Sequence, residues 1–335
     1  MNRRRFLQST AAFTALTAAE FAPWQNMSAL AREVEDFVRG PAVKDHPLQQ
    51  LSKHVWMIYS PDGFPTPENQ GMMCNITFVD TAKGLVVVDS GASVQIGEMA
   101  IRQIRKQFKK PVIAIINTHY HGDHWLGNDA FATAYKGIPI YAHAGTIAEI
   151  QGMQGNMWRT LMEQWTNQAT IGTRVVRPNL PLEHGAELKF GDVTLRMHHY
   201  GTAHTQSDLC VEVVEDKVML VGDVAMDRRI ANMDDGSYTG TLKTYDALEK
   251  TGSTLWLPGH GKPSADVLTW NRELFEGIYL PCEQAVKDGL PLEEAKKIIL
   301  MDPRVASRAK DTKGFDINIG KYVSIAYLEA EAAGF

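Results

Sequence analysis

The sequence predicts an α/β protein in which helices cover the outer faces of two packed sheets, an αββα sandwich of four layers with a helical C-terminal extension. After about residue 50, short strand-like segments alternate with helical ones in two successive blocks. From residue 265 onward the pattern is helical only. Sheets and helices that each bury one face pack in layers, and four layers accommodate both blocks.

The first block contains five predicted strands and two predicted helices. Its first two strands alternate apolar and polar residues, as half-buried strands do, whereas "GLVVVDSG" is a β-branched run typical of a fully buried strand. The predicted strands are 54–60, 74–80, 84–91, 112–119 and 138–145, and the predicted helices are 94–110 and 146–165.

The second block repeats this organisation and leads into the extension. The predicted strands are 193–201, 207–215, 217–224 and 254–261, with a helix around 242–250. In the extension, Pro281 and Pro291 are predicted to break the helices, because proline lacks the backbone N–H that a helix interior uses.

The segment "NTHYHGDHWLGN" (117–128) follows a predicted buried strand and clusters three histidines with an aspartate. In extended backbone, alternate side chains share one face, so His119 and His121 point the same way. Asp123 and His124 follow Gly122 and can turn toward a second position. The motif therefore offers two ligands to each of two metal ions.

Later strand ends supply further ligand types: "GTAHTQSD" contains His204, "VGDVAMD" contains Asp223 and "LPGHGKP" contains His260. Ligand sites in α/β proteins form at such strand ends. We predict two metal positions that share one bridging carboxylate. The first is formed by His119, His121 and His204, the second by Asp123, His124 and His260, and Asp223 bridges them.

This arrangement resembles the metallo-β-lactamase superfamily, through the HxHxDH motif at 119–124, the "VVVDSG" aspartate and the three later ligands. The resemblance spans roughly residues 50–264. It implies the αβ/βα sandwich and two zinc ions, with iron or manganese as alternatives. It also implies that Asp89 orients the ligand loop by accepting a hydrogen bond, and that Asp123 orients the attacking hydroxide.

Two positions refine the resemblance. Asp223 stands where the commonest zinc β-lactamases carry a cysteine, and His124 stands where they carry a different residue. Both choices are similar to glyoxalase II and its relatives, which hydrolyse thioesters. The long insert and the C-terminal helices resemble periplasmic metallohydrolases linked to sulfur oxidation and quinoprotein systems, for which a thiol-ester hydrolase role is one suggestion.

The resemblance implies a hydrolase that cleaves a thioester, ester or lactam-type acyl bond of a small molecule by metal-bound hydroxide. Three alternatives stay open. The chain is an iron-dependent thiol or persulfide oxidoreductase on the same fold, a β-lactamase, or a metal-binding protein without turnover. All seven ligand positions hold ligand-type residues, which favours two hydrolytic metals over the iron alternative.

Several residues outside the ligand set are candidates for substrate contact. The helical segment 153–165 carries an apolar stripe, formed by Met153, Met157, Trp158, Leu161, Met162 and Trp165. The stripe either packs on the core or forms an adaptable wall over the site. Met72 and Met73 are candidates for an opposite wall. Arg228 and Arg229 either receive a substrate carboxylate or form a solvated pair.

Composition excludes other classes. A net charge of −5 provides no polybasic surface, so nucleic acid is not an expected partner. The three cysteines are widely spaced and predict no disulfide framework. No internal stretch predicts stable membrane insertion.

The N-terminus predicts export to the periplasm. "RRRFL" (Arg3–Leu7) precedes a modest apolar run that is too short to span a bilayer, an arrangement similar to a twin-arginine signal. The predicted organisation is therefore a signal peptide at 1–31, a catalytic domain at 32–264 and a helical extension at 265–335.

Changing Arg3 and Arg4 together to lysine is expected to leave folded protein in the cytoplasm, because the twin-arginine pathway reads the arginine pair rather than positive charge alone. Immunoblots of periplasmic and cytoplasmic fractions measure the distribution. Normal periplasmic levels of the double variant would contradict this interpretation of the N-terminus.

Overall fold

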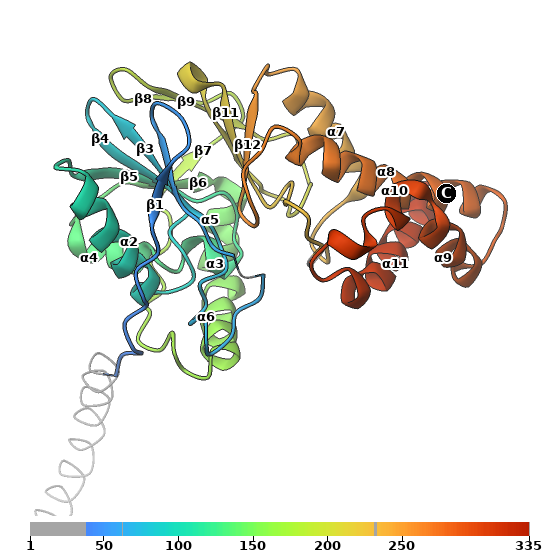
Figure 1. Ribbon diagram of the computed structural model, residues 1–335, viewed down its shortest axis with the longest axis horizontal. Helices are drawn as coiled ribbons and strands as arrows, with labels where there is room; N and C mark the ends of the chain where they lie inside the picture. The colour runs from blue at the N-terminus through green and yellow to red at the C-terminus, as the bar shows by residue number, and fades with distance from the viewer. Residues whose placement is uncertain (1–37, 62, 231–232, 335) are drawn as a thin grey trace, which may run out of the picture.

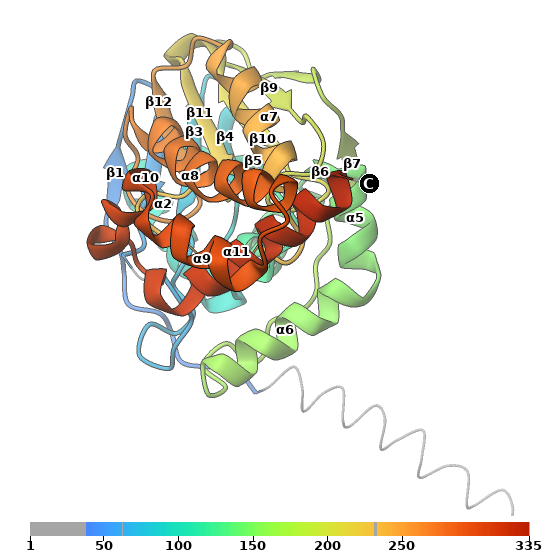
Figure 2. The ribbon, with the colours of Figure 1, turned by 90° about the vertical axis from the view of Figure 1, so that its right-hand side faces the viewer.

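The computed structural model describes residues 38–61, 63–230 and 233–334 (Figures 1 and 2). The predicted signal peptide at 1–31 lies outside the described residues, and its role stays a prediction. Within the described part of the chain, no helix has the length and apolar character needed to cross a membrane.

Two sheets form the centre of the molecule. The first has seven strands in chain order: β1 (Leu48–Gln50), β2 (Val55–Ile58), β3 (Ile76–Thr81), β4 (Gly84–Val88), β5 (Val112–Ile116), β6 (Ile140–His143) and β7 (Leu180–Leu182). Strands β1 to β4 pair antiparallel, and β4 to β7 pair parallel. The parallel half therefore brings the carboxyl ends of β4 and β5 to the same edge.

The second sheet has five strands in the order β12-β11-β10-β9-β8. They are β8 (Glu187–Lys189), β9 (Thr194–His198), β10 (Cys210–Val213), β11 (Val218–Gly222) and β12 (Leu255–Pro258). Strands β11 and β12 are parallel, so both end at the edge where the polar motifs begin. The three-residue strands β1, β7 and β8 were not predicted, since they are too short to show a period.

The layers are visible in the distribution of buried side chains. The facing sides of the sheets bury one apolar cluster, which includes Val86, Val88, Val211 and Leu220. Outside the first sheet, a second cluster packs against α2 (Val94–Gln107) and α4 (Asn128–Ala134). Outside the second sheet, a third packs against α7 (Tyr238–Glu249) and the start of α8 (Val267–Lys287). The predicted four-layer sandwich with C-terminal helices is confirmed.

The predicted helix at 146–165 is two helices, α5 (Ala144–Gln151) and α6 (Met153–Trp165). Gly152 separates them with a non-helical backbone, at φ −77° and ψ −133°. The apolar period continues through Gly152, so the sequence pattern predicts one uninterrupted helix. After the break, α6 runs in a different direction from α5 along the lower side of the molecule in Figure 2, and Met162 of α6 belongs to the apolar cluster outside the first sheet.

The extension contains α9 (Leu292–Met301), α10 (Pro303–Ala306) and α11 (Phe315–Ala333), packed on the second half of α8. The prediction that Pro281 breaks a helix is wrong, because α8 continues through it to Lys287. Ile278 and Cys282 on either side are fully buried against α11. This packing outweighs the roughly 3 kcal/mol that an interior proline costs. Pro291 does precede a new helix, as predicted.

Candidate metal centre

The seven predicted ligand side chains converge at the edge of the sandwich. His119 follows β5, and His121 to His124 form the start of the short helix α3 (Gly122–Trp125). The other three follow β9, β11 and β12. All seven are buried, with exposed fractions between 0% and 8%: His119, His121, Asp123, His124, His204, Asp223 and His260.

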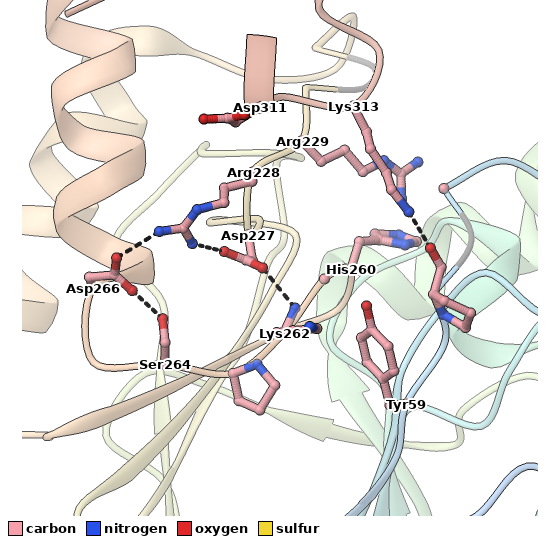
Figure 3. A pocket seen from close by; sticks show the side chains of 14 residues that line it. Tyr59, Asp227, Arg228, Arg229, His260, Lys262, Ser264, Asp266, Asp311 and Lys313 are labelled. Carbon is pink, nitrogen blue, oxygen red and sulfur yellow. Dashed lines mark hydrogen bonds and ion pairs between the residues drawn. The ribbon is translucent and has the colours of Figure 1, made fainter. Parts of the chain in front are cut away.

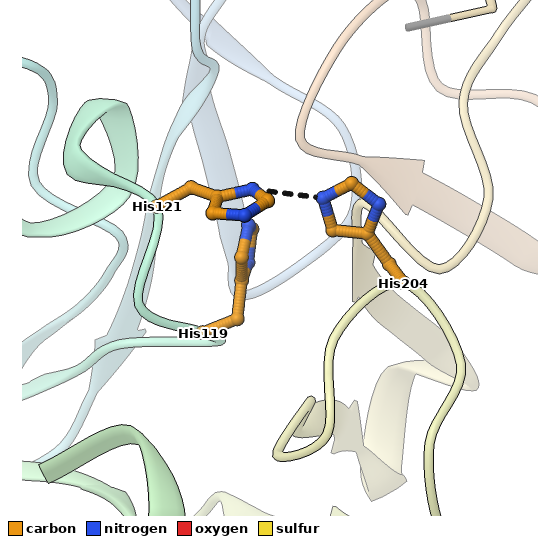
Figure 4. A group of neighbouring side chains, drawn as sticks. All are labelled: His119, His121 and His204. Carbon is orange, nitrogen blue, oxygen red and sulfur yellow. Dashed lines mark hydrogen bonds between the residues drawn. The ribbon is translucent and has the colours of Figure 1, made fainter. Parts of the chain in front are cut away.

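His119, His121 and His204 form the first group (Figure 4). His121 Nδ1 lies 3.0 Å from His204 Nε2. The His119 ring lies 4.7 Å from the His121 ring and 5.0 Å from the His204 ring, centre to centre. One nitrogen from each residue lies within 4.8 Å of the others, which is a spacing that one metal ion can bridge.

Asp123, His124 and His260 form the second group. Asp123 Oδ2 lies 3.1 Å from His260 Nε2 and 3.3 Å from His124 Nε2. These three atoms also satisfy the spacing of a single metal position.

The Asp223 carboxylate lies between the two groups. Its Oδ2 is 3.2 Å from His260 Nε2 and 3.6 Å from His204 Nε2, and its Oδ1 is 3.4 Å from His124 Nε2. One carboxylate thus reaches nitrogens of both groups, which is the geometry that a bridging ligand requires.

Unpartnered buried atoms test whether this centre fits metal ions. Four buried ligand atoms have no hydrogen-bond partner within the described residues: His119 Nε2, Asp123 Oδ2, His124 Nε2 and Asp223 Oδ1. Buried polar atoms are nearly always bonded, so four orphans in one place indicate a missing partner. Imidazole nitrogens and carboxylate oxygens are zinc donors, and the same donors also accept iron or manganese. The residues therefore fit two metal ions.

Asp89 ties the ligand loop to the end of β4. Its carboxylate accepts hydrogen bonds from the Thr118 backbone N–H and the Thr118 hydroxyl, both at 2.9 Å, and lies 2.8 Å from His124 Nδ1. The backbone of Asp89 is left-handed, with φ 57°, a conformation that is uncommon outside glycine. These contacts are those of an orienting residue, which is the role that we assign to Asp89.

Three further orienting contacts were not predicted. His121 Nε2 lies 3.1 Å from Asp235 Oδ2, and His260 Nδ1 lies 2.8 Å from the Met73 carbonyl. His119 Nδ1 lies 3.1 Å from the Thr118 hydroxyl. Each contact engages the ring nitrogen that faces away from the centre and so leaves the other nitrogen free for metal. Thr118 belongs to the 117–128 motif, whereas Asp235 and the Met73 carbonyl come from loops that carry no local sequence signal.

Gly259 allows the ligands to approach one another. A Cβ atom at this position would lie 2.3 Å from Asp223 Oδ1 and 2.7 Å from His124 Cε1, closer than atoms can approach. The close approach of the ligands therefore requires a glycine before His260.

The histidines differ in proton affinity. Burial, together with the neighbouring His121, lowers the pKa of His204 to about 3, and burial lowers the pKa of His119 well below its usual value. For His260, burial and the Arg229 charge lower the pKa, but Asp223 and Asp123 outweigh them and raise it. The pKa of His124 is also raised against the effect of burial, by its acidic neighbours Cys74, Asp123 and Asp223.

A cavity of about 790 Å³ opens directly onto the centre. Trp158, Met162 and Trp165 of α6 form one wall, so part of the predicted stripe faces the site. Met153 and Met157 do not line the cavity and are 86% and 42% exposed, because they lie on the outer face of α6.

The opposite wall differs from the prediction at one residue. Met73 lines the cavity, whereas Met72 is buried in the core behind the first sheet. Phe64 and Pro65 also line the cavity, and the Phe64 ring lies 5.3 Å from the Trp165 ring, centre to centre. Ile317 and Lys321 of α11 line it as well.

The two arginines after Asp223 have different environments. Arg228 is 42% exposed and lies 2.9 Å from Asp266, in an ion pair at the surface. Arg229 lines the cavity beside the centre. Only Arg229 is therefore placed to meet a molecule in the cavity.

Comparison with known proteins agrees with this geometry. The family profile described as metallo-beta-lactamase superfamily matches residues 69–260, more than half of the chain. The chain belongs to the metallo-beta-lactamase superfamily. As a member of this superfamily it is a metal-dependent hydrolase, with a cluster of histidine and aspartate residues at the expected position.

Relatives within the superfamily are distant. The metallo-beta-lactamase type 2 of Bacillus cereus is 26% identical over 221 residues, which are 64% of this chain and 76% of that protein. The linear primary-alkylsulfatase of a Pseudomonas species is 38% identical over 55 residues, only 16% of this chain and 10% of that protein. The solved metallo-beta-lactamase of Pontibacter korlensis superposes with a TM-score of 0.55 at 18% identity, over 68% of this chain and 98% of that one. This structural likeness supports the fold alone.

Asp223→Ala is expected to lower the metal content and to reduce hydrolysis by more than about 100-fold, because loss of an orienting partner alone typically costs 10- to 100-fold. Metals per chain after dialysis and kcat/KM measure the two effects. Asp246→Ala removes a carboxylate that is 62% exposed and serves as the control. Full metal occupancy and wild-type activity of Asp223→Ala would remove this residue from the centre.

The affinity of the metal-free protein for zinc is expected to fall as pH falls. Metal ligation requires neutral imidazoles, and the raised pKa values of His124 and His260 mean that protons compete at these two rings. Each displaced proton changes the apparent affinity about tenfold per pH unit below its pKa. Calorimetric titration near pH 6 and pH 8, in buffers of different ionisation enthalpy, measures affinity and proton release. Affinity that does not change with pH would contradict the assignment.

Proposed function

We propose that the chain is an exported, dinuclear zinc hydrolase that cleaves an acyl thioester. The observation that supports it best is the pair of three-residue groups joined by the Asp223 carboxylate, with four buried ligand atoms left unpartnered within the described residues. The cavity with tryptophans on one wall gives a small acyl substrate access to this centre.

Zinc bound at these positions would lower the pKa of water toward neutrality and polarise a carbonyl group. Asp123, which lies beside His124 and His260 in the second group, would orient the attacking water and accept its proton. Asp89 and Asp235 hold His124 and His121 in position during the reaction. The leaving group departs on the side of His124 and His260. No serine or cysteine nucleophile is required.

The ligand set favours a thioester over a lactam. An oxygen ligand at Asp223 and a histidine at position 124 are the features that resemble glyoxalase II and its relatives. β-Lactam hydrolysis is the second candidate, supported by the similarity to the Bacillus cereus metallo-beta-lactamase. A β-lactam is a strained amide, so the same centre can open it as a side reaction.

An iron-dependent thiol or persulfide oxidoreductase is the rival within the same fold. The presence of both three-residue groups favours two hydrolytic metals. Export to the periplasm and the likeness to hydrolases linked to sulfur oxidation are parts of the same proposal, and they rest on the N-terminal motif and on the arrangement of insert and extension.

Substrates with good leaving groups are expected to react fastest, because departure of the leaving group becomes easier as its pKa falls. A thiolate leaves readily and binds zinc well, so kcat/KM should rank an acyl thioester above the matching oxygen ester and above a carbapenem. Activity that a chelator abolishes and zinc restores would support the proposal. One iron per chain, no turnover of the three substrates and oxygen consumption with a thiol would contradict it.

A further inference from the structure

Three aromatic side chains of the cavity follow one another outward from the metal centre. The Trp158 ring lies 4.9 Å from the His121 ring, centre to centre. The Trp165 ring lies 6.1 Å from the Trp158 ring and 5.3 Å from the Phe64 ring. Trp158, Trp165 and Phe64 all line the cavity of about 790 Å³, and we call these three residues the aromatic ladder. The aromatic ladder begins at a predicted metal ligand and ends at a loop of the opposite wall.

The inner end of the aromatic ladder is packed against the ligand loop. A Cβ atom at Gly122 would lie 2.7 Å from the Trp158 Cβ and 3.1 Å from its Cγ, closer than carbon atoms normally pack. Gly122 stands between the ligands His121 and Asp123, so α6 approaches the centre as closely as the backbone allows. Because Trp158 also contacts the His121 ring, the aromatic ladder lies on the side of the first ligand group.

The outer end of the aromatic ladder is open to solvent. Phe64 is 58% exposed, and Ile317 of α11, which also lines the cavity, is 86% exposed. Met73 and Met162 line the same cavity. Apolar side chains that line a cavity and stay uncovered are typical of a binding surface for apolar groups.

The lysines of this cavity already have acceptors. Lys313 donates to the Pro61 carbonyl, and Lys321 Nζ lies 2.6 Å from Asp234 Oδ2. A ligand beside the aromatic ladder therefore meets rings and thioethers rather than an unpaired ammonium group.

The other end of the centre faces a charged cavity. This second cavity, of about 540 Å³, shares His260 and Arg229 with the first (Figure 3). Charged side chains supply much of its remaining lining, namely Asp227, Arg228, Lys262, Asp266, Asp311 and Lys313. His260 belongs to the second ligand group. The surroundings of the centre are therefore aromatic beside the first group and charged beside the second.

We propose that the aromatic ladder is the subsite for an apolar acyl chain, so that the substrate is the thioester of an acid with a chain of several carbons. This inference rests on the proposed function and names its substrate class. The carbonyl carbon has to lie at the centre, and the leaving group departs on the side of His124 and His260. The acyl chain then extends along Trp158 and Trp165, where burial of apolar area needs no directional partner.

Binding tests the proposal without turnover. The zinc-loaded protein is titrated calorimetrically with acetohydroxamic, butanohydroxamic, hexanohydroxamic and octanohydroxamic acids, whose head group binds zinc and whose chain takes the place of the acyl chain. Affinity is expected to rise about two- to fourfold per added methylene, the upper figure corresponding to complete burial. Trp165→Ala and Phe64→Ala should each lower the affinity for octanohydroxamic acid roughly tenfold, as loss of cover from about two methylenes would, and leave acetohydroxamic acid within about twofold.

Met157→Ala is the matched control, because Met157 lies on the outer face of the same helix and does not line the cavity. Affinity that does not depend on chain length in the wild type, or a loss in Met157→Ala equal to that in Trp165→Ala, would overturn the proposal. Zinc content and circular dichroism confirm that each variant is folded and loaded. If Trp165→Ala does not fold, Phe64→Ala decides by the same comparison, since the Phe64 side chain is largely exposed.

Two isomeric thioesters test which side of the centre receives the chain. S-Ethyl octanethioate and S-octyl ethanethioate have the same composition, but the first carries its long chain on the acyl side and the second on the thiol side. KM should be lower for S-ethyl octanethioate, and Trp165→Ala should raise KM for that isomer alone. Hydrolysis of both isomers with equal KM in every variant would refute the acyl subsite alone. Hydroxamate binding that depends on Trp165 in a protein that hydrolyses neither isomer would refute the hydrolase function and leave the subsite standing.

Discussion

The burial of two carboxylates among five imidazoles is the constraint on which the rest of this structure depends. Asp123 and Asp223 are 3% and 8% exposed, and each has an oxygen without a hydrogen-bond partner in the described residues. Burying an ionised carboxylate is costly unless a positive charge accompanies it. The neighbouring carboxylates raise the pKa values of His124 and His260 against the effect of burial, so positive charge is favoured at these two rings. Metal ions bound here would supply the same positive charge.

Much of the fold could be predicted from sequence because its central strands are strongly patterned. The run at 84–88 is fully buried, and its β-branched residues identify it without any other information. Short strands such as β7 and β8 carry three residues each, too few for a period to appear. Prediction from sequence failed in opposite ways at Gly152 and Pro281. Gly152 ends a helix although the apolar period continues through it, whereas tertiary packing keeps α8 helical through Pro281.

The candidate site was predictable to the extent that its residues belong to motifs. The seven side chains that converge were all identified, because each stands after a strand and is of a ligand type. Asp235 and the Met73 carbonyl could not be identified, since their contacts with His121 and His260 arise from loops that only the fold brings near. The sequence could not decide whether Arg228 and Arg229 meet the substrate or form a solvated pair, because both are arginines in adjacent positions. The structure distinguishes them, since Arg228 pairs with Asp266 at the surface and Arg229 Nη1 is buried.

Helix α8 joins the sandwich and the extension into one folding unit. Val267 and Leu268 at its start belong to the apolar cluster beside the second sheet, and Ile278 and Cys282 belong to the cluster of the extension. Glu329 of α11 accepts the backbone N–H groups of Tyr238 and Thr239, at 2.7 and 3.0 Å, in the first turn of α7. A helix of the sandwich is thus capped by a side chain from the far end of the chain. Loss of the extension would leave Ser237 as the cap of that turn, through the Gly240 N–H, and would leave the second half of α8 bare. Both parts should therefore protect their amides from hydrogen exchange together and lose that protection in one cooperative transition.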